Sequence, residues 1–213
     1  VRFFLLNSAE PWQDYDWRDD LVGTVRDQLE RFWNRAGEVI DDAEPDPAPL
    51  SEFALEPIDR WLLSRLQAVA RDVTDALERA ETRTASQAAF YNLEEDLRWY
   101  RRRAELDRPA ARRTLREALE TRLRLLAPFV PFLANELHER LTGVPAEDAP
   151  WPEPREAFES RSIELAEAQV ERLTEDVHDI VDVTDTDPDV VRVYVAADWK
   201  RRVFDAVVEA GAD

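Results

Sequence analysis

The sequence predicts an all-α fold, an antiparallel helical bundle, followed by a small truncated α/β piece. Apolar residues recur at spacings of three and four in five successive segments, which is the period of a helix with one buried face. The links between those segments are short, as they are between neighbouring helices of a bundle. The alternation that indicates a strand occurs near the end of the chain.

Each bundle helix is recognised by its apolar stripe and by the residues at its ends. The expected helices are Leu21–Ile40, Ile58–Ala80, Thr84–Arg103, Arg108–Ala127 and a fifth that begins at Pro131 and ends at Gly143. Pro57 suits the first turn of the second helix, because a first-turn amide has no helical partner in any case. Asp19 or Asp20 can cap the first helix, and Asp107 the fourth. Three prolines make Asp41–Leu50 an extended loop.

Two prolines, Pro128 and Pro131, predict a sharp corner between the fourth and fifth helices. Pro128 cannot donate to the helical hydrogen-bond ladder, and Pro131 fixes the backbone angle at which a new helix opens. The corner is expected to be filled by the apolar side chains of Phe129, Val130, Phe132 and Leu133. Considered singly, these residues indicate a packed hinge without chemistry.

The two ends of the chain carry the remaining elements. Val1–Ala9 begins with an apolar run that is too short to fold alone. After the bundle, Ser160–Val181 has the stripe of a long helix, and a turn is expected at Asp185–Asp189. Val191–Val195 then alternates as a strand does, and Asp198 is expected to cap a last helix. This helix–strand–helix is the α/β piece, and it is truncated because one strand forms no sheet.

The chain is strongly acidic, with 47 acidic against 28 basic side chains and a formal net charge of −19. Lys200 is the only lysine. An acidic, lysine-poor composition is typical of proteins that work in multimolar salt, where the Debye length falls to ~3 Å and self-repulsion is screened. The composition therefore predicts a halophile protein.

Several classes of protein are excluded by what the sequence lacks. Without cysteine there are no disulfides, thiolate nucleophiles or cysteine-bound zinc. Four glycines supply no phosphate-binding loop, and neither His138 nor His178 stands in a ligand motif. We therefore expect no catalytic residue, metal site or cofactor in this segment. No apolar run could span a bilayer, and no signal peptide is present, so a soluble cytoplasmic protein without a membrane partner is expected.

One zone of the chain is basic. Between Arg98 and Arg124 there are ten arginines against four acidic residues. A cluster of positive charge on an acidic protein is typical of a polyanion-binding surface. The planar guanidinium group of arginine suits phosphate. Trp99 or Tyr100 could stack on a sugar or base. The candidate RNA-binding residues are Arg98, Trp99, Arg101, Arg102, Arg103, Arg112, Arg113, Arg116, Lys200 and Arg201.

The same arginines have a structural interpretation, which stays open at this point. Arginine near the C-terminus of a helix is favoured by the helix dipole. Glu94, Glu95 and Glu117 lie at helical spacing from several of the arginines and could pair with them.

Three stretches carry a resemblance to a known family. Leu126–Leu137 resembles the Leu-Ala-Pro-Phe-x-Pro signature of helical anticodon-binding-type domains in class I aminoacyl-tRNA synthetases. Phe90–Arg103, with Asp-Leu-Arg-Trp-Tyr at its centre, is similar to a run of archaeal-type leucyl-tRNA synthetases. Tyr194–Lys200 resembles the start of the C-terminal domain of those enzymes. The signature usually has His, Glu and Trp where this chain has Phe132, Asn135 and His138.

The resemblance implies a parent enzyme and a division of the chain. The enzyme would leucylate a leucine-accepting tRNA with ATP and Mg²⁺, and its catalytic and editing residues would lie upstream. The missing methionine likewise indicates a piece of a longer protein or a processed product. Residues 1–18 would be the tail of the catalytic domain, residues 19–155 the helical bundle and residues 156–213 the start of the C-terminal domain. The implied partners are tRNA and the upstream catalytic domain of the same polypeptide.

Two alternatives remain from the sequence. The bundle could belong to an isoleucyl-, valyl- or methionyl-type synthetase, although the Arg-Trp-Tyr run favours the leucyl type. It could also be a structural helical scaffold without an RNA partner. Binding of leucine-accepting tRNA separates these possibilities.

Overall fold

A computed structural model describes residues 1–14, 17, 19–43, 47–184, 188, 190–194 and 196–209, with side chains as far as Val207. The chain divides into two compact units, Val1–Glu159 and Ser160–Asp213. The domain boundaries that the resemblance suggests, after residues 18 and 155, stay predictions.

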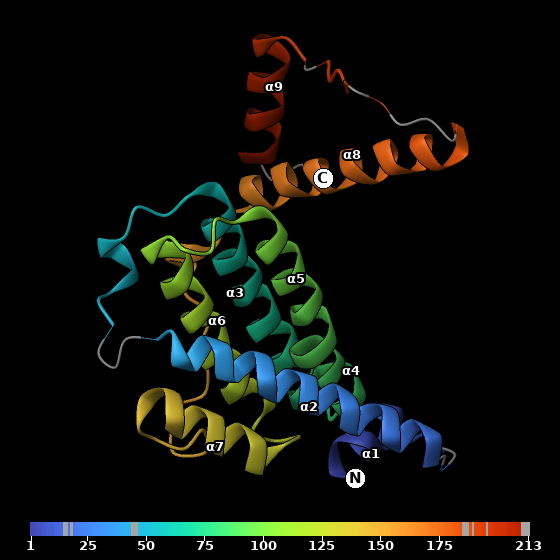
Figure 1. The fold of residues 1–213 in the computed structure, drawn as a ribbon, viewed down its shortest axis with the longest axis vertical. Helices are drawn as coiled ribbons and strands as arrows, with labels where there is room; N and C mark the ends of the chain where they lie inside the picture. The colour runs from blue at the N-terminus through green and yellow to red at the C-terminus, as the bar shows by residue number, and fades with distance from the viewer. Residues whose placement is uncertain are drawn as a thin grey trace. The chain divides into compact units, whose positions relative to one another are not determined.

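The first unit is a helical bundle, which confirms the predicted fold class. Its elements are α1 (Arg2–Ser8), α2 (Asp19–Asp41), a 3-10 turn at Leu50–Glu52, α3 (Pro57–Glu78), α4 (Thr82–Gln87), a π turn at Ala88–Asn92, α5 (Leu93–Arg103), α6 (Pro109–Leu126), α7 (Pro131–Thr142) and a second 3-10 turn at Glu156–Phe158. Helix α3 packs against α5 and α6. Helix α2 runs transverse to α3 and α5 and packs against α6 and α7 (Figure 1).

The predicted apolar stripes form the core of this unit. On α3 the stripe of Ile58, Leu62, Leu66, Val69 and Val73 is buried. Its counterpart on α6 is made by Ala111, Leu115, Leu119, Leu123 and Leu126, all of them buried as well. Burial of such faces supplies most of the stability of a helical protein.

The ends of α6 and α7 differ partly from expectation. Gly143 ends α7 in the left-handed conformation (φ 83°), as predicted. Asp107 was expected to cap α6, and this is wrong, because Arg108 holds the N-cap position before Pro109. The predicted apolar corner is correct for Phe129, which is 1% exposed. It is wrong for Phe132, which is 90% exposed, because that side chain lies on the outer face of the first turn of α7.

The predicted helix Thr84–Arg103 is interrupted by the π turn, which separates α4 from α5. A π turn shifts the hydrogen-bond register and leaves backbone carbonyls available to side chains. The carbonyls of Ala89 and Phe90 accept hydrogen bonds from the Arg122 guanidinium. A side chain from α6 thus stabilises the irregular turn.

The N-terminal segment folds against the bundle. Phe3 is buried on the rings of Phe90 and Tyr91, which allows a helix as short as α1. Glu10 then caps α4, because its carboxylate accepts hydrogen bonds from the backbone amides of Arg83 and Thr84 at 3.1 and 3.0 Å. The N-terminal residues therefore belong to the core of the first unit.

The second unit contains α8 (Arg161–Thr184) and α9 (Asp198–Glu209), close to the two predicted helices. The expected strand is not confirmed, because residues 190–194 form no strand where the structure describes them. An isolated strand has no neighbour for its backbone hydrogen bonds, so alternating valines alone do not form a strand. Most of the predicted turn at Asp185–Asp189, and Val195, lie outside the described residues. No described helix is both long enough and apolar enough to cross a bilayer.

Candidate nucleic-acid interface

Helix α5 ends in three successive arginines beside a tryptophan. Its first turn carries Glu94, Glu95 and Asp96, and its last turn carries Arg101, Arg102 and Arg103, an order that complements the helix dipole. The Arg102 guanidinium lies 5.0 Å from the centre of the Trp99 ring, and that of Arg103 lies 6.0 Å away. Both arginines are exposed, so α5 presents two guanidinium groups supported by an aromatic ring.

The two aromatic residues of α5 are not available for stacking on a base, contrary to the sequence prediction. Trp99 is 7% exposed and Tyr100 is fully buried. The Tyr100 hydroxyl donates a hydrogen bond to the Asp59 carboxylate at 2.6 Å. Burial, together with that carboxylate, raises the pKa of the Tyr100 hydroxyl. Leu93, Leu97 and Tyr100 recur at helical spacing and are buried, so this face of α5 is turned toward the core. The neighbouring Trp99 supports arginines instead.

The arginine at the start of α6 has a structural role. Arg108 donates two hydrogen bonds to the Asp59 carboxylate, at 3.0 and 3.1 Å, in a bidentate pair. Asp59 is fully buried, and it also accepts a hydrogen bond from the backbone amide of Glu56 at the start of α3. This carboxylate therefore joins α3, α5 and α6. Sequence reasoning missed it because its partners lie 41 and 49 residues away.

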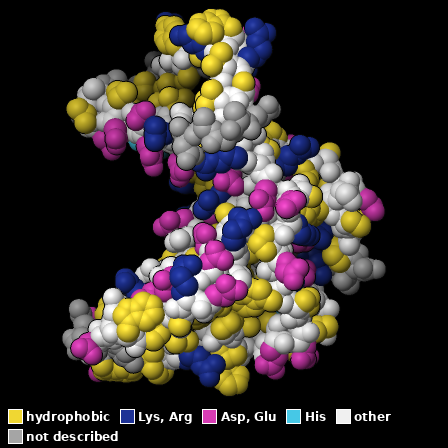
Figure 2. Space-filling model, turned by 180° about the vertical axis from the view of Figure 1, so that it is seen from behind, with side chains coloured by type: hydrophobic (Ala, Val, Ile, Leu, Met, Phe, Trp, Pro, Cys, Tyr) yellow, Lys and Arg dark blue, Asp and Glu magenta, His cyan; other side chains and the backbone are white. Residues whose placement is uncertain are grey.

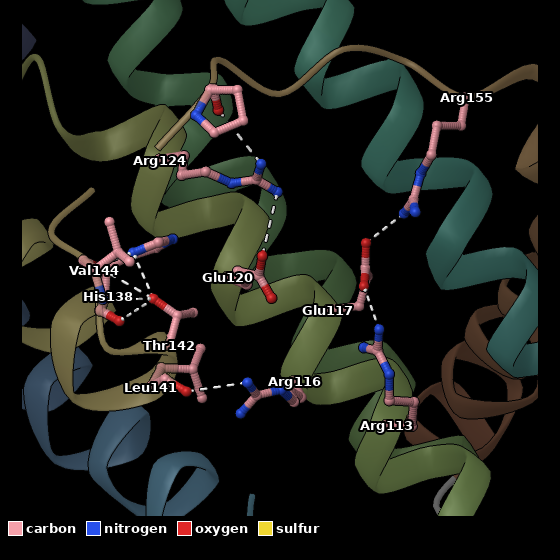
Figure 3. A network of polar contacts seen from close by, with 11 residues as sticks. Arg113, Arg116, Glu117, Glu120, Arg124, His138, Leu141, Thr142, Val144 and Arg155 are labelled. Atoms are coloured by element: carbon pink, nitrogen blue, oxygen red, sulfur yellow. Dashed lines mark hydrogen bonds and ion pairs between the residues drawn. The ribbon is translucent and has the colours of Figure 1, made fainter. Parts of the chain in front are cut away.

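Two further arginines of α6, Arg113 and Arg116, are also held within the fold (Figure 3). Arg113 pairs with Glu117 at 3.0 Å and donates to the Ala48 carbonyl. Arg116 is 5% exposed and donates to the Leu141 carbonyl at the end of α7. Glu117 also pairs with Arg155, so its two carboxylate oxygens have separate partners. The structural interpretation is correct for these side chains.

Arg122 is the most deeply buried of the arginines. Its side chain is 2% exposed and pairs with Glu94 at 2.8 Å. The guanidinium also lies over the rings of Phe32 and Phe90, at 4.6 and 5.3 Å. Burial lowers its pKa to about 10 despite the attraction of the Glu94 carboxylate. Arg35 from α2, with a side chain that is 39% exposed, shares that carboxylate at 3.0 Å, so a charge cluster around the buried Arg122 joins α2, α5 and α6.

The predicted RNA-binding residues thus fall into distinct groups. In the first unit Arg98, Arg102, Arg103 and Arg112 are exposed and Arg101 is half-buried, with burial lowering the Arg101 pKa. Trp99, Arg113 and Arg116 are inside the fold. Lys200 and Arg201 are exposed on α9 of the second unit, where the Lys200 ammonium lies 5.6 Å from the Trp199 ring. Basic and acidic side chains are interleaved on the face seen in Figure 2, so exposed arginines stand among carboxylates.

Two neighbouring cavities lie beside these arginines. One, of about 130 Å³, is lined by Arg101, Arg112, Glu38 and apolar residues. The other, of about 100 Å³, is lined by Arg112, Arg113 and Arg116 together with residues that follow α2. Arg112 and Asp42 line both. Sequence reasoning did not find these cavities, which form where the loop after α2 meets α6. Within the described residues, no cluster of three acidic or histidine side chains could hold a metal ion.

The model of the family described as "Anticodon-binding domain of tRNA ligase" matches residues 59–192, well over half of the chain. The chain belongs to this anticodon-binding domain family. The match begins at the buried Asp59 and includes the arginines of both α5 and α6.

Several relatives of this anticodon-binding domain are archaeal enzymes. The leucine–tRNA ligase of Methanothrix thermoacetophila is 38% identical over 98% of this chain and 21% of its own length. The leucine–tRNA ligase of Pyrococcus horikoshii is 39% identical, with the same coverage. The chain therefore spans about a fifth of the length of the curated relatives that it matches.

A solved structure shares the fold of the domain. It is the ternary complex of Agrobacterium radiobacter K84 agnB2 LeuRS with tRNA and LeuAMS. The likeness has a TM-score of 0.60 at 21% identity, and it covers 75% of this chain and 20% of the LeuRS chain.

Proposed function

We propose that this chain is the tRNA-binding portion of a leucyl-tRNA synthetase. The observation that carries the proposal is the similarity to archaeal leucine–tRNA ligases along 98% of the chain. The parent enzyme would join leucine to leucine-accepting tRNA at the expense of ATP, with Mg²⁺, in an upstream catalytic domain. Translation takes place in the cytoplasm, so the activity implies a cytoplasmic enzyme. Residues 1–213 would dock the tRNA rather than perform the chemistry.

The exposed arginines of the first unit are the best candidates for the docking contacts. We call Arg98, Arg102, Arg103 and Arg112 the arginine surface. Each guanidinium can donate a bidentate pair of hydrogen bonds to a phosphate. Trp99 holds the guanidinium groups of Arg102 and Arg103 over its ring, which reduces the rotamer freedom lost when RNA binds. Such contacts position a nucleic acid without reading its bases.

A titration with leucine-accepting tRNA over a series of KCl concentrations tests the proposal. We expect binding that weakens as salt rises, because phosphate contacts release counterions. Replacing Arg98 and Arg102 by Gln should weaken binding roughly tenfold or more and reduce the salt slope by about 1 for each lost contact. Circular dichroism at each salt concentration checks that the bundle remains folded.

Arg83→Gln is the matched control. Arg83 is exposed on α4, at the opposite end of the helical run that ends at Arg103, about 30 Å away along the axis. This substitution removes one positive charge, as Arg98→Gln and Arg102→Gln each do singly, and should leave tRNA affinity unchanged. An equal loss in Arg83→Gln would show that only net charge matters. No binding at any salt concentration would favour the helical scaffold, and a preference for isoleucine-, valine- or methionine-accepting tRNA would favour those synthetases.

A further inference from the structure

The smaller of the two cavities, here called the α6 cavity, has the lining of an anion site. It measures about 100 Å³, several times the roughly 10–15 Å³ that a cavity needs to hold one water molecule. Its lining includes Arg112, Arg113 and Arg116 together with Phe53 and Asp42. Three arginines thus line a space large enough for a small tetrahedral ion.

Some donors around the α6 cavity are not used by the described part of the fold. Nε of Arg116 and Nη1 of Arg113 are buried and have no hydrogen-bond partner there. Buried donors are nearly always paired, so an unpaired one points to an acceptor that the described residues do not supply. Arg112 is exposed, and its side chain makes no hydrogen bond or ion pair with any described residue. Two of the three arginines that line the cavity therefore keep a buried N–H group without a partner among the described residues.

The charge balance also favours an anion. Among the described residues that line the α6 cavity, three cations stand against the single carboxylate of Asp42. Two further acids, Glu117 and Glu120, act on Arg116. Glu117 already shares its two oxygens between Arg113 and Arg155, and Glu120 pairs with Arg124 at 3.9 Å. Burial lowers the pKa of the Arg116 guanidinium, and the neighbouring charge of Arg113 lowers it further. An anion between these groups would relieve both effects, whereas a metal cation would be repelled.

The α6 cavity lies at the beginning of an 18-residue helix. Pro109, the first residue of α6, is part of its lining, and the N-cap residue Arg108 makes no side-chain capping hydrogen bond. The positive end of the helix dipole adds to the attraction of the arginines.

We propose that the α6 cavity binds a phosphate group. A phosphate offers several strong acceptor oxygens, which matches a set of donors on three guanidinium groups. The phosphate could belong to the RNA backbone or to free inorganic phosphate. The RNA source rests on the proposed function, whereas binding of inorganic phosphate does not.

Thermal unfolding with inorganic phosphate is the first arm of the test. Phosphate is compared with chloride at equal ionic strength, so that general screening is the same. We expect phosphate to raise the melting temperature with a saturable dependence on concentration, because a ligand that binds only the folded state stabilises it. Arg112→Gln should raise the dissociation constant roughly tenfold or more. Arg112 is exposed, so this variant keeps the fold, and Arg83→Gln should behave as the wild-type chain does.

A nuclear magnetic resonance measurement locates the ion. The Nε–H signal of Arg116 should move when phosphate is added to the wild-type chain and should stay in place in Arg112→Gln. A melting temperature that depends on phosphate no more than on chloride would overturn the proposal. The same response in wild type and Arg112→Gln, or an unmoved Arg116 signal, would overturn it too.

Competition with leucine-accepting tRNA is the second arm and identifies the source of the phosphate. If inorganic phosphate weakens tRNA binding in the wild-type chain more than in Arg112→Gln, at equal ionic strength, the α6 cavity takes an RNA phosphate. If phosphate stabilises the chain but leaves tRNA affinity unchanged, the site is supported with free phosphate as its ligand. A chain that binds phosphate but no tRNA would remove the proposed function and leave this site. A chain that binds tRNA but no phosphate would do the reverse.

Discussion

Helices α5 and α6 are both rich in arginine, yet they use it in opposite ways. At the end of α5, Arg102 and Arg103 are exposed on the ring of Trp99. On α6, Arg113, Arg116 and Arg122 bind carboxylates and carbonyls of the protein itself. The first group can contact a ligand without disturbing the fold, whereas the second group is part of what holds the fold together.

The difference follows from the positions of the two helices. Helix α6 packs against α2, α3 and α7, so even its polar side is partly covered. A guanidinium in such a place loses water and must find acceptors, because an unpaired buried charge is very costly. Arg102 and Arg103 in the last turn of α5 are exposed to solvent and carry no such requirement. A count of charges along the sequence treats the two groups alike, and burial separates them.

Arg122→Met should have the largest effect on stability. It leaves the Glu94 carboxylate and the carbonyls of Ala89 and Phe90 without this partner. Breaking a buried pair in this way costs about 3–5 kcal/mol. Urea unfolding at constant KCl concentration measures the change. A loss below about 1 kcal/mol would contradict a structural role for the α6 arginines.

A double variant sharpens that experiment. Glu94→Gln combined with Arg122→Met should recover part of the lost stability, because the unpaired carboxylate is removed. Recovery should be incomplete, since the two carbonyls stay unpaired and Arg35 loses its ion pair with Glu94. Additive losses from the two substitutions would mean that the pair is not coupled.

Arg108→Gln should have the next largest effect. It removes both bidentate hydrogen bonds to the fully buried Asp59 and leaves Tyr100 and the Glu56 amide as that carboxylate's partners. We expect a loss of about 2–3 kcal/mol, the value of hydrogen bonds to a charged group. The control is Arg112→Gln, one helical turn further along α6 and exposed, which should change the free energy of unfolding by less than about 0.5 kcal/mol. Similar losses in both variants would erase the distinction between embedded and exposed arginines.

Tyr100 makes the free energy of unfolding depend on pH. Its pKa is raised in the folded state, so it stays protonated there, whereas a tyrosine in the unfolded chain ionises above about pH 10. Above that pH the unfolded chain therefore binds fewer protons than the folded chain. The free energy of unfolding is highest below that pH and falls as the pH rises, by up to about 1.4 kcal/mol per pH unit. Tyr100→Phe should unfold more easily at neutral pH, because the hydrogen bond to Asp59 is lost, but should show a shallower decline at alkaline pH. Urea unfolding of both chains at matched pH values measures this, and parallel declines would refute it.

The fold could be predicted because its determinants are local. Apolar stripes such as Ile58, Leu62 and Leu66, prolines at helix starts and Gly143 at a helix end each act within a turn or two of the chain. The misses have non-local causes. The π turn depends on Arg122, which lies more than thirty residues away. The alternation at residues 190–194 lacks the neighbouring strand that would turn it into a sheet.

The candidate site could be predicted only in outline. The sequence located the basic zone, and its helical spacing already allowed the pair of Arg113 and Glu117. It could not show that Trp99 faces inward or that Arg116 reaches a carbonyl at the end of α7. Those facts depend on which side of each helix is covered by another helix. Exposure is a property of packing, so it separates the two groups of arginines only in three dimensions.

Arg102→Gln should have the smallest effect on stability. The guanidinium lies over an aromatic ring near the surface, an interaction worth about 0.5–1 kcal/mol. Arg102→Lys keeps a cation near the Trp99 ring and should be as stable as the wild-type chain in urea. It loses the planar fork that binds phosphate in a bidentate manner, so its affinity for leucine-accepting tRNA should still fall. A stability loss comparable to that of Arg122→Met would place Arg102 among the structural arginines, whereas unchanged tRNA affinity in both variants would remove it from the arginine surface.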